Sequence, residues 1–237
     1  MSATKVPPTP GSAPSTPSIP ERPASKGGLN AKQRQEVIAL ATLVPFRPRA
    51  ILYRENAAEA FIFVCADGVL KSYRDLPSGR RRVFTFRYPG DLFGLAEAGR
   101  YVNTVQAVTS GSVYRIPIEP LHAKLRQDGD LQFQVLTRVT QELREAQRQS
   151  IVLSRRSADG RIAMFLKQLQ GYLAAQSIDL IPLPMSRSDI AAFLGLTLES
   201  VSRGMAKLTR NGIVAPQGQR YLQIVSQKKL DALAADV

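Results

Sequence analysis

The chain has 237 residues, of which 44% are hydrophobic and 22% charged, enough for the cores of two modest domains. Its net charge of +13 and pI of about 10.3 favour a polyanionic partner, although a ribosomal or membrane-surface protein can be equally basic. A single cysteine, Cys65, excludes a disulfide framework within one chain, and neither a membrane-spanning run nor a signal-type segment is present. We therefore expect a cytoplasmic protein that does not enter a membrane.

Residues 1–30 form the first distinct segment, because proline, serine, threonine and glycine are frequent in them. Such a composition cannot bury enough apolar surface to offset the entropy of ordering, so we predict a disordered tail. A tail that binds a partner is the functional alternative. Helical spacing of the next apolar residues predicts a short helix over Ala31–Leu43.

Between Phe46 and Pro117, short β-rich runs alternate with turn signals such as Pro77-Ser78-Gly79 and Pro89-Gly90-Asp91. This spacing predicts an antiparallel barrel or roll, and the absence of intervening helices excludes parallel βαβ units. We assign residues 31–130 to this β-roll, a sensor-like domain, with strands expected at Ala60–Cys65, Val69–Tyr73, Arg82–Arg87, Val102–Val108 and Ser112–Ile118.

Leu131–Leu153 is predicted to form one long helix with a coiled-coil-like apolar seam. Packing of this seam on the chain's own barrel is the alternative to a dimer. We favour a dimer, because a two-fold symmetric partner site needs two recognition units. Residues 131–156 then comprise the dimerisation helix and a basic hinge at Ser154–Ser157. The apolar seam residues recur at spacings of three and four, and they are Leu136, Val139, Leu143, Ala146 and Leu153. Ser150 is the one polar member of the seam.

Residues 157–237 are predicted to form a winged helix-turn-helix domain. A helix over Ala158–Ala175 leads through Ile178–Met185 into two short helices, which are joined by a tight turn at Gly195-Leu196. Thr197 is the expected N-cap of the second helix, and Asn211-Gly212 is its expected end. A hairpin around Gln217-Gly218-Gln219 would form the wing. The predicted buried faces of the two helices carry Ile190, Ala191 and Leu194, then Val201, Met205 and Leu208.

The opposite side of the second helix carries side chains that can read base edges in a major groove. Arg203 can donate twice to guanine, Glu199 can accept from the amino group of cytosine, and Leu198 can pack on a thymine methyl. We add Ser202 to these base-reading residues. A solvated Glu–Arg pair is the alternative for Glu199 and Arg203, but the turn, the spacing and the basic surroundings favour DNA reading.

A β-roll, a long helix and a winged helix-turn-helix in this order resemble the CRP/FNR superfamily of bacterial transcription regulators, over roughly residues 40–226. The pattern E-x-x-S-R at Glu199–Arg203 is similar to the FNR and FixK branch, which reads TTG…CAA inverted repeats. The resemblance implies an α+β fold, a homodimer and double-stranded DNA as partner. It also implies that the DNA backbone is contacted by Arg187, Ser188, Thr197 and Ser200. We add Lys207, on the exposed helix face, to these contacts.

The resemblance extends to the segment Pro89–Leu95, which in the family leads into a cyclic-nucleotide pocket. Nucleotide-binding members place a glutamate where Leu95 stands and Arg-Ser where Tyr101-Val102 stand, and Glu97 and Arg100 are not obvious substitutes. A buried cyclic phosphate would lack a cation here, so we expect no nucleotide. Arg81, Arg82, Arg87 and Arg100 are the candidates for the alternative, a regulator gated by an unidentified effector in the roll.

We expect no cofactor and no metal. One cysteine cannot hold an iron–sulfur cluster within one chain, and His122 lies outside the centre of the roll as an expected surface residue. Cys65 lies in an apolar strand, where an inert buried thiol is expected rather than a redox switch. An enzyme on a cupin-like barrel would need several ligands in the roll, which has no histidine.

The sequence therefore predicts a transcription regulator of the FixK type rather than an enzyme, and an activator of oxygen-responsive genes. A non-specific nucleic-acid binder remains the alternative that charge alone allows. The loop Leu76–Val83 is placed like the loops that contact RNA polymerase in the family, so RNA polymerase is an expected partner.

Overall fold

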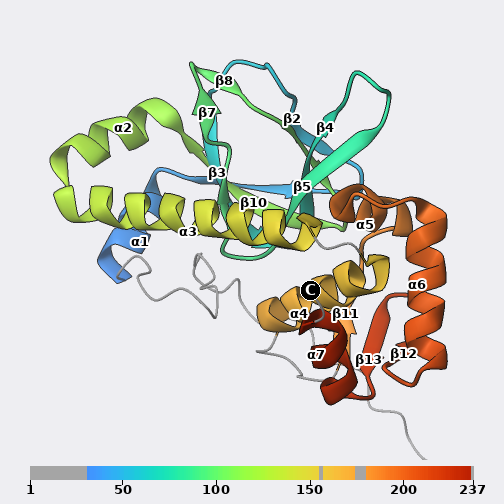
Figure 1. Ribbon diagram of the computed structural model, residues 1–237. Helices are drawn as coiled ribbons and strands as arrows, with labels where there is room; N and C mark the ends of the chain where they lie inside the picture. The colour runs from blue at the N-terminus through green and yellow to red at the C-terminus, as the bar shows by residue number, and fades with distance from the viewer. Residues whose placement is uncertain (1–30, 155–156, 174–179, 236–237) are drawn as a thin grey trace, which may run out of the picture.

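The computed structural model describes residues 31–154, 157–173 and 180–235. Figure 1 shows a β-rich N-terminal part, the long helix α3 running along it, and a helical C-terminal part beside the end of α3. The predicted α+β architecture is thereby confirmed. The tail predicted at residues 1–30 lies outside the described residues, as does part of the predicted hinge.

The N-terminal part is an antiparallel β-roll of two facing sheets. One sheet has the order β1-β10-β3-β6, the other has the order β2-β9-β4-β5, and β7 pairs with β8. Its interior is apolar and holds Cys65, Leu70 and Val105 with no exposed surface. The strands are β1 (Thr42–Phe46), β2 (Ile51–Tyr53), β3 (Phe61–Asp67), β4 (Leu70–Asp75), β5 (Arg81–Arg87), β6 (Leu92–Phe93), β7 (Ala96–Glu97), β8 (Arg100–Tyr101), β9 (Thr104–Ala107) and β10 (Gly111–Pro117).

The helix predicted over Ala31–Leu43 is shorter than expected. Helix α1 spans Ala31–Ala39, and the next residues form the edge strand β1, in which Val44 lies opposite Val113 of β10. The high β propensity of Thr42 and Val44 favours this strand, and Pro45 is tolerated because β1 has a neighbour on one side only. Helical spacing alone therefore extended the prediction too far.

Two helices follow the roll, α2 (Ile118–Gln127) and α3 (Gly129–Ser154). Asp128 caps α3, because its Oδ1 accepts the backbone N–H of Leu131 at 2.9 Å. The 26 residues of α3 agree with the predicted long helix. Within the described residues, none of the helices has the length and apolarity that a membrane crossing requires.

In the described residues, the C-terminal part has four helices, two of which form the helix-turn-helix, and a small antiparallel sheet of order β11-β13-β12. Strand β11 was expected only as a connection to the first short helix. It pairs with β13 of the predicted wing, Ile181 opposite Leu222. The elements are α4 (Ala158–Leu173), β11 (Leu180–Pro182), α5 (Arg187–Leu194), α6 (Leu198–Arg210), β12 (Val214–Gln217), β13 (Tyr221–Ile224) and α7 (Gln227–Ala235).

Candidate nucleic-acid interface

The turn between α5 and α6 has the geometry that the sequence predicted. Gly195 ends α5 in the left-handed region at φ 64°, a conformation that other residues adopt at a cost. Thr197 then caps α6, because its hydroxyl oxygen accepts the backbone N–H of Ser200 at 3.1 Å. The two helices of the motif are therefore joined by a turn that is fixed at both ends.

The inner faces of α5 and α6 are buried as predicted, and they hold the outer face of α6 in place. Val201, Met205 and Leu208 are at most 5% exposed. Sequence reasoning missed Gly204, where a Cβ would lie 2.4 Å from Cδ1 of Ile162 on α4. A glycine in the middle of a predicted helix is a signal that could have indicated this close approach of α4 to α6.

The predicted base-reading residues all lie on the outer face of α6. Leu198, Glu199, Ser202 and Arg203 are exposed, and Figure 1 shows α6 at the outer edge of the C-terminal part. Hydrogen bonds from the backbone N–H of Glu199 itself and from the Thr197 side chain lower the pKa of the Glu199 carboxyl, and Arg203 lowers it further. Glu199 is therefore held as a charged acceptor.

The predicted backbone contacts differ in how freely they can reach a phosphate. Ser188 and Thr197 are exposed, and Oγ1 of Thr197 also lies 3.1 Å from Oγ of Ser200. Arg187 is half-buried, burial lowers its pKa, and its Nη1 has no hydrogen-bond partner. Lys207 is exposed, but its Nζ lies 2.5 Å from Oδ2 of Asp159 on α4.

The predicted dimer seam on α3 includes two large apolar side chains that face solvent. Leu136 is 62% and Leu143 59% exposed, Ala146 is exposed and Val139 is half-buried. Leu153 is placed differently, because it is half-buried with Cδ2 beside Gly195 in the turn of its own chain. Sequence reasoning missed Phe133 and Ile151, which are 65% and 59% exposed on α3. Phe133 lies one step of three before Leu136, and this spacing could have indicated it.

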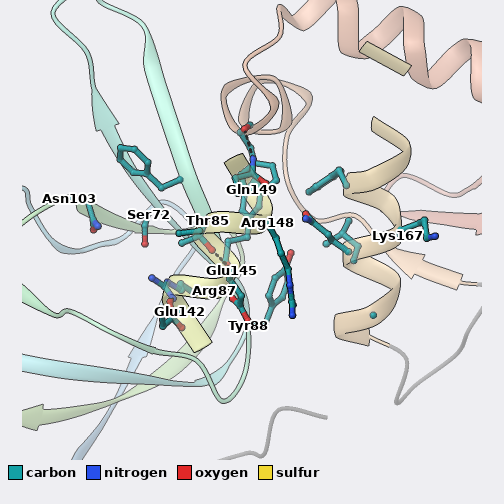
Figure 2. Close-up of a pocket in the computed structure, with 18 residues that line it drawn as sticks. Ser72, Thr85, Arg87, Tyr88, Asn103, Glu142, Glu145, Arg148, Gln149 and Lys167 are labelled. Carbon is teal, nitrogen blue, oxygen red and sulfur yellow. Dashed lines mark hydrogen bonds and ion pairs between the residues drawn. The ribbon is translucent and has the colours of Figure 1, made fainter. Parts of the chain in front are cut away.

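Polar contacts join the β-roll to α3. Arg87 of β5 pairs with Glu142 of α3, and Arg138 of α3 donates to the Gly90 carbonyl at 2.5 Å. Beside the first pair lies a cavity of about 440 Å³ between β5, α3 and α4, shown in Figure 2. The roll contributes polar side chains to its lining, among them Ser72 and Asn103.

The arginine candidates of the roll do not converge on this cavity. Arg87 lines it, whereas Arg81 pairs with Asp75 and lies over the Tyr73 ring. Arg82 lies beside Gly195 of the helix-turn-helix, and Arg100 donates to the carbonyl of Asn56 at the surface.

The positions where nucleotide-binding relatives carry charge are apolar or aromatic here. Tyr101 is buried, its ring stacks on Tyr53 at 3.9 Å, and its hydroxyl donates to the Phe61 carbonyl at 2.8 Å. Leu95 and Val102 are partly exposed apolar side chains. None of these residues offers a cation to a cyclic phosphate.

The two residues considered for redox or metal chemistry lie apart from each other. Cys65 is fully buried, and burial raises the pKa of its thiol to about 12. His122 is exposed on α2. In the parts of the chain that the structure describes, no three His, Cys, Asp or Glu side chains are grouped to hold a metal ion.

Comparisons with known proteins agree with this arrangement. Residues 43–128 match the cyclic nucleotide-binding domain family, and residues 160–233 match the Crp-like helix-turn-helix domain family. The transcriptional activatory protein AadR of Rhodopseudomonas palustris is 33% identical over 88% of this chain and 88% of its own. The nitrogen fixation regulation protein FixK of Bradyrhizobium diazoefficiens is 32% identical over 87% of this chain and 88% of its own.

A solved structure supports the same assignment. FixK2 from Bradyrhizobium japonicum matches with a TM-score of 0.78 and 31% identity, over 83% of this chain and 98% of that chain. The relatives are transcription regulators rather than enzymes. Their matches span both the β-roll and the helix-turn-helix part of this chain. The chain therefore belongs to the CRP/FNR family of DNA-binding transcription regulators and is similar to its FixK-type members.

Proposed function

We propose that the protein binds, as a homodimer, an inverted repeat with TTG…CAA half-sites and activates oxygen-responsive genes. The observation that carries this proposal is the exposed face of α6 beyond a turn of fixed geometry. The names of relatives agree with it, because they include transcriptional activators and, at 28% identity, an anaerobic regulatory protein of Haemophilus influenzae.

The exposed side chains of α6 suit bases of this half-site. Arg203 donates two hydrogen bonds to O6 and N7 of the guanine, and Glu199 accepts from the amino group of the cytosine. Leu198 packs on a thymine methyl, and Ser202 is short enough to contact only the backbone or a neighbouring methyl. Arg203 and Glu199 are one helical turn apart, so both face the same few base pairs.

The backbone contacts fix the orientation in which these side chains reach the bases. The start of α5, with Arg187 and Ser188, and the start of α6, with Thr197 and Ser200, both offer backbone N–H groups to phosphate. Lys207 joins this set by exchanging Asp159 for a phosphate.

A second copy of the chain explains the exposed apolar side chains of α3. Leu136 and Leu143 are each about three-fifths exposed, and covering them in a dimer removes this apolar surface from water. The pairing of two α3 helices also gives two reading heads. Two-fold symmetry then requires an inverted repeat with half-site centres about 34 Å apart.

The test is selection of DNA from a random pool by the purified full-length protein. Recovery of TTG…CAA repeats with one fixed separation is the expected result. Recovery of unrelated sequences, or of single half-sites without symmetry, would contradict the proposal. Light scattering on the same sample reports the mass of the protein in solution.

RNA polymerase is a proposed partner, and the cytoplasm is the proposed location of the protein. The turn between β4 and β5 carries Leu76, which is 40% exposed, and Gly79 at φ 76°. This exposed turn is the surface that we assign to RNA polymerase. In vitro transcription with a Leu76→Asp variant should lose activation while DNA binding is kept.

Effector control is a second candidate function, and the cavity beside α3 favours it. Oγ of Ser72, Oδ1 of Asn103 and Oε1 of Glu142 line or adjoin it without a hydrogen-bond partner. Equilibrium DNA binding with cyclic AMP, and with the small-molecule fraction of a bacterial extract, tests it. No change with cyclic AMP is expected, because Tyr101 and Leu95 replace the charged groups that it needs. A change in DNA affinity with the extract fraction would establish this second function.

A further inference from the structure

The first helix of the helix-turn-helix is attached to the β-roll. Leu70 of β4 points into the roll core, so the next residue, Lys71, projects from the opposite face of the strand. Its Nζ lies 2.5 Å from Oδ1 of Asp189 near the start of α5. The two side chains keep only 11% and 15% of their surface exposed, so solvent and salt screen the ion pair weakly.

The same carboxylate organises the start of α5. The Ser186 hydroxyl donates to Oδ2 of Asp189 at 2.8 Å, and the backbone N–H of Asp189 donates to Ser186 Oγ at 3.0 Å. Asp189 directly follows Ser188 and lies two residues after Arg187, the proposed phosphate contacts. Through Asp189, Lys71 therefore holds the helix end that is proposed to meet the DNA backbone.

Aromatic packing joins the roll to α5 beside the ion pair. Phe86 lies opposite Lys71 in the β4–β5 ladder, and its ring centroid is 5.2 Å from that of Phe193 on α5. Phe165 of α4 completes the contact at 5.5 Å from Phe193. Gln149 of α3 donates from Nε2 to the Phe193 carbonyl at 3.0 Å. The roll, α3 and α4 thus meet at α5.

We propose that Lys71 is a positioning residue for DNA binding. Through Asp189 it fixes the direction in which each α6 is held, and so it sets the half-site separation that the two heads of a dimer read together. This inference rests on the proposed function, because it requires two heads that bind one inverted repeat. Lys71 itself does not contact DNA.

The charge of Asp189 allows the proposal to be tested by the direction in which DNA affinity changes. A carboxylate beside phosphate contacts repels DNA, so its neutralisation would raise DNA affinity if it had no positioning role. The proposal requires the opposite result. Asp189→Asn and Lys71→Met should each weaken binding at the preferred separation by about tenfold, a part of the cost of losing one partner of a buried ion pair.

The experiment measures binding of full-length variants to inverted repeats whose half-site separation changes one base pair at a time. The unmodified protein should prefer one separation, and Lys71→Met and Asp189→Asn should lose this preference. Binding of Lys71→Met to a single half-site should be kept within about twofold, because each head and the cap of α5 remain intact. Lys71→Arg should restore the preference, and the double variant should be no weaker than either single variant.

Arg74→Met is the matched control, because Arg74 lies on the same strand and pairs with Glu55 at the surface. It removes the same charge and should leave the separation preference unchanged. Thermal unfolding checks that each variant folds. If Asp189→Asn does not fold, Lys71→Met decides the question with the cap of α5 intact.

Two results in the single variants overturn the inference: an unchanged separation preference in Lys71→Met, or tighter binding by Asp189→Asn. Additive losses in the double variant also overturn it, because they would mean that the two residues act independently. If the unmodified protein itself shows no preferred separation, the proposed two-headed reading fails instead. The two failures are therefore distinguishable.

Discussion

Single residues of α6 divide between a buried face and a face exposed to solvent. Val201 and Leu208 are buried, whereas Glu199 and Arg203 face solvent. The sequence predicted both faces, because a helix on a small domain must bury one stripe and the spacing of three and four identifies it. It did not predict the pairing of Lys207 with Asp159, since charges 48 positions apart on different helices have no local signature.

Glu199 is expected to keep its charge on the acid side of neutrality. The pKa of its carboxyl is lowered, so the charged acceptor is present at neutral pH and is lost only as the pH falls through that lowered value. Competition binding should show the same discrimination at the cytosine from about pH 7 to about pH 5.5, above the usual range of a glutamate. Glu199→Gln, which is neutral throughout, is the control and should discriminate less at every pH. Loss of discrimination near pH 6 would contradict the expectation.

Gly204 is expected to accept a side chain only at a cost, because the buried Ile162 side chain would have to shift. A Cβ there would lie 2.4 Å from Ile162 Cδ1, so Gly204→Ala should lower the free energy of unfolding by about 1–3 kcal/mol, as overpacking does. A Cβ added at Gly171 on α4 would meet no atom within 4 Å, and Gly171→Ala should instead be neutral or stabilising by up to about 1 kcal/mol. Urea unfolding of both variants measures the difference. Equal effects would mean that α4 and α6 are not packed as closely as described.

At the scale of elements, periodicity predicted the long helix and both short helices because each carries its apolar residues along one face. It did not predict β1 and β11, which are strands of five and three residues that depend on partners elsewhere in the chain. Leu153 shows the same limit within a helix. Its spacing from Ala146 and Ser150 places Leu153 in the predicted seam, yet the turn at Gly195 lies against it in the structure.

The α3 seam makes a prediction about assembly. Leu143→Glu should place an unpaired charge in the dimer contact and weaken the dimer by several kcal/mol, about 3 or more. Leu43→Glu is the control, because Leu43 is an apolar residue that is 51% exposed on β1, outside the proposed seam. Light scattering should find monomers of the first variant and dimers of the second. A Leu143→Glu protein that remains a dimer would contradict the seam.

At the scale of the whole molecule, the β-roll and the winged helix-turn-helix share one hydrophobic cluster. Tyr73, Val83 and Phe86 of the roll pack with Phe165 and Phe193 of the C-terminal part. The sequence predicted each part but not this contact, because the partners are about a hundred residues apart and neither surface has a distinctive pattern. The relative placement of the reading head is therefore information that only the structure supplies.

The pair Arg87–Glu142 is expected to hold the roll against α3. Arg87→Met leaves Glu142 largely buried without its partner and should lower the free energy of unfolding by about 3 kcal/mol. Arg87→Met combined with Glu142→Met should cost less than the single change, because no buried charge remains unpaired. Urea unfolding at one fixed protein concentration measures both, since a dimer's stability depends on concentration. A double variant less stable than Arg87→Met would contradict this role.

The most direct test of base reading by α6 is a competition series over half-sites altered at each base, at two salt concentrations, for Arg203→Ala and Arg187→Ala. Arg203→Ala should lose about 1–3 kcal/mol per half-site and its preference at the guanine alone. Arg187→Ala, its matched control, should weaken all sequences alike and reduce the salt slope by about one per contact. If Arg203→Ala weakened TTG sites and guanine-lacking sites equally, Arg203 would be a phosphate contact and the proposed reading of the half-site would be wrong.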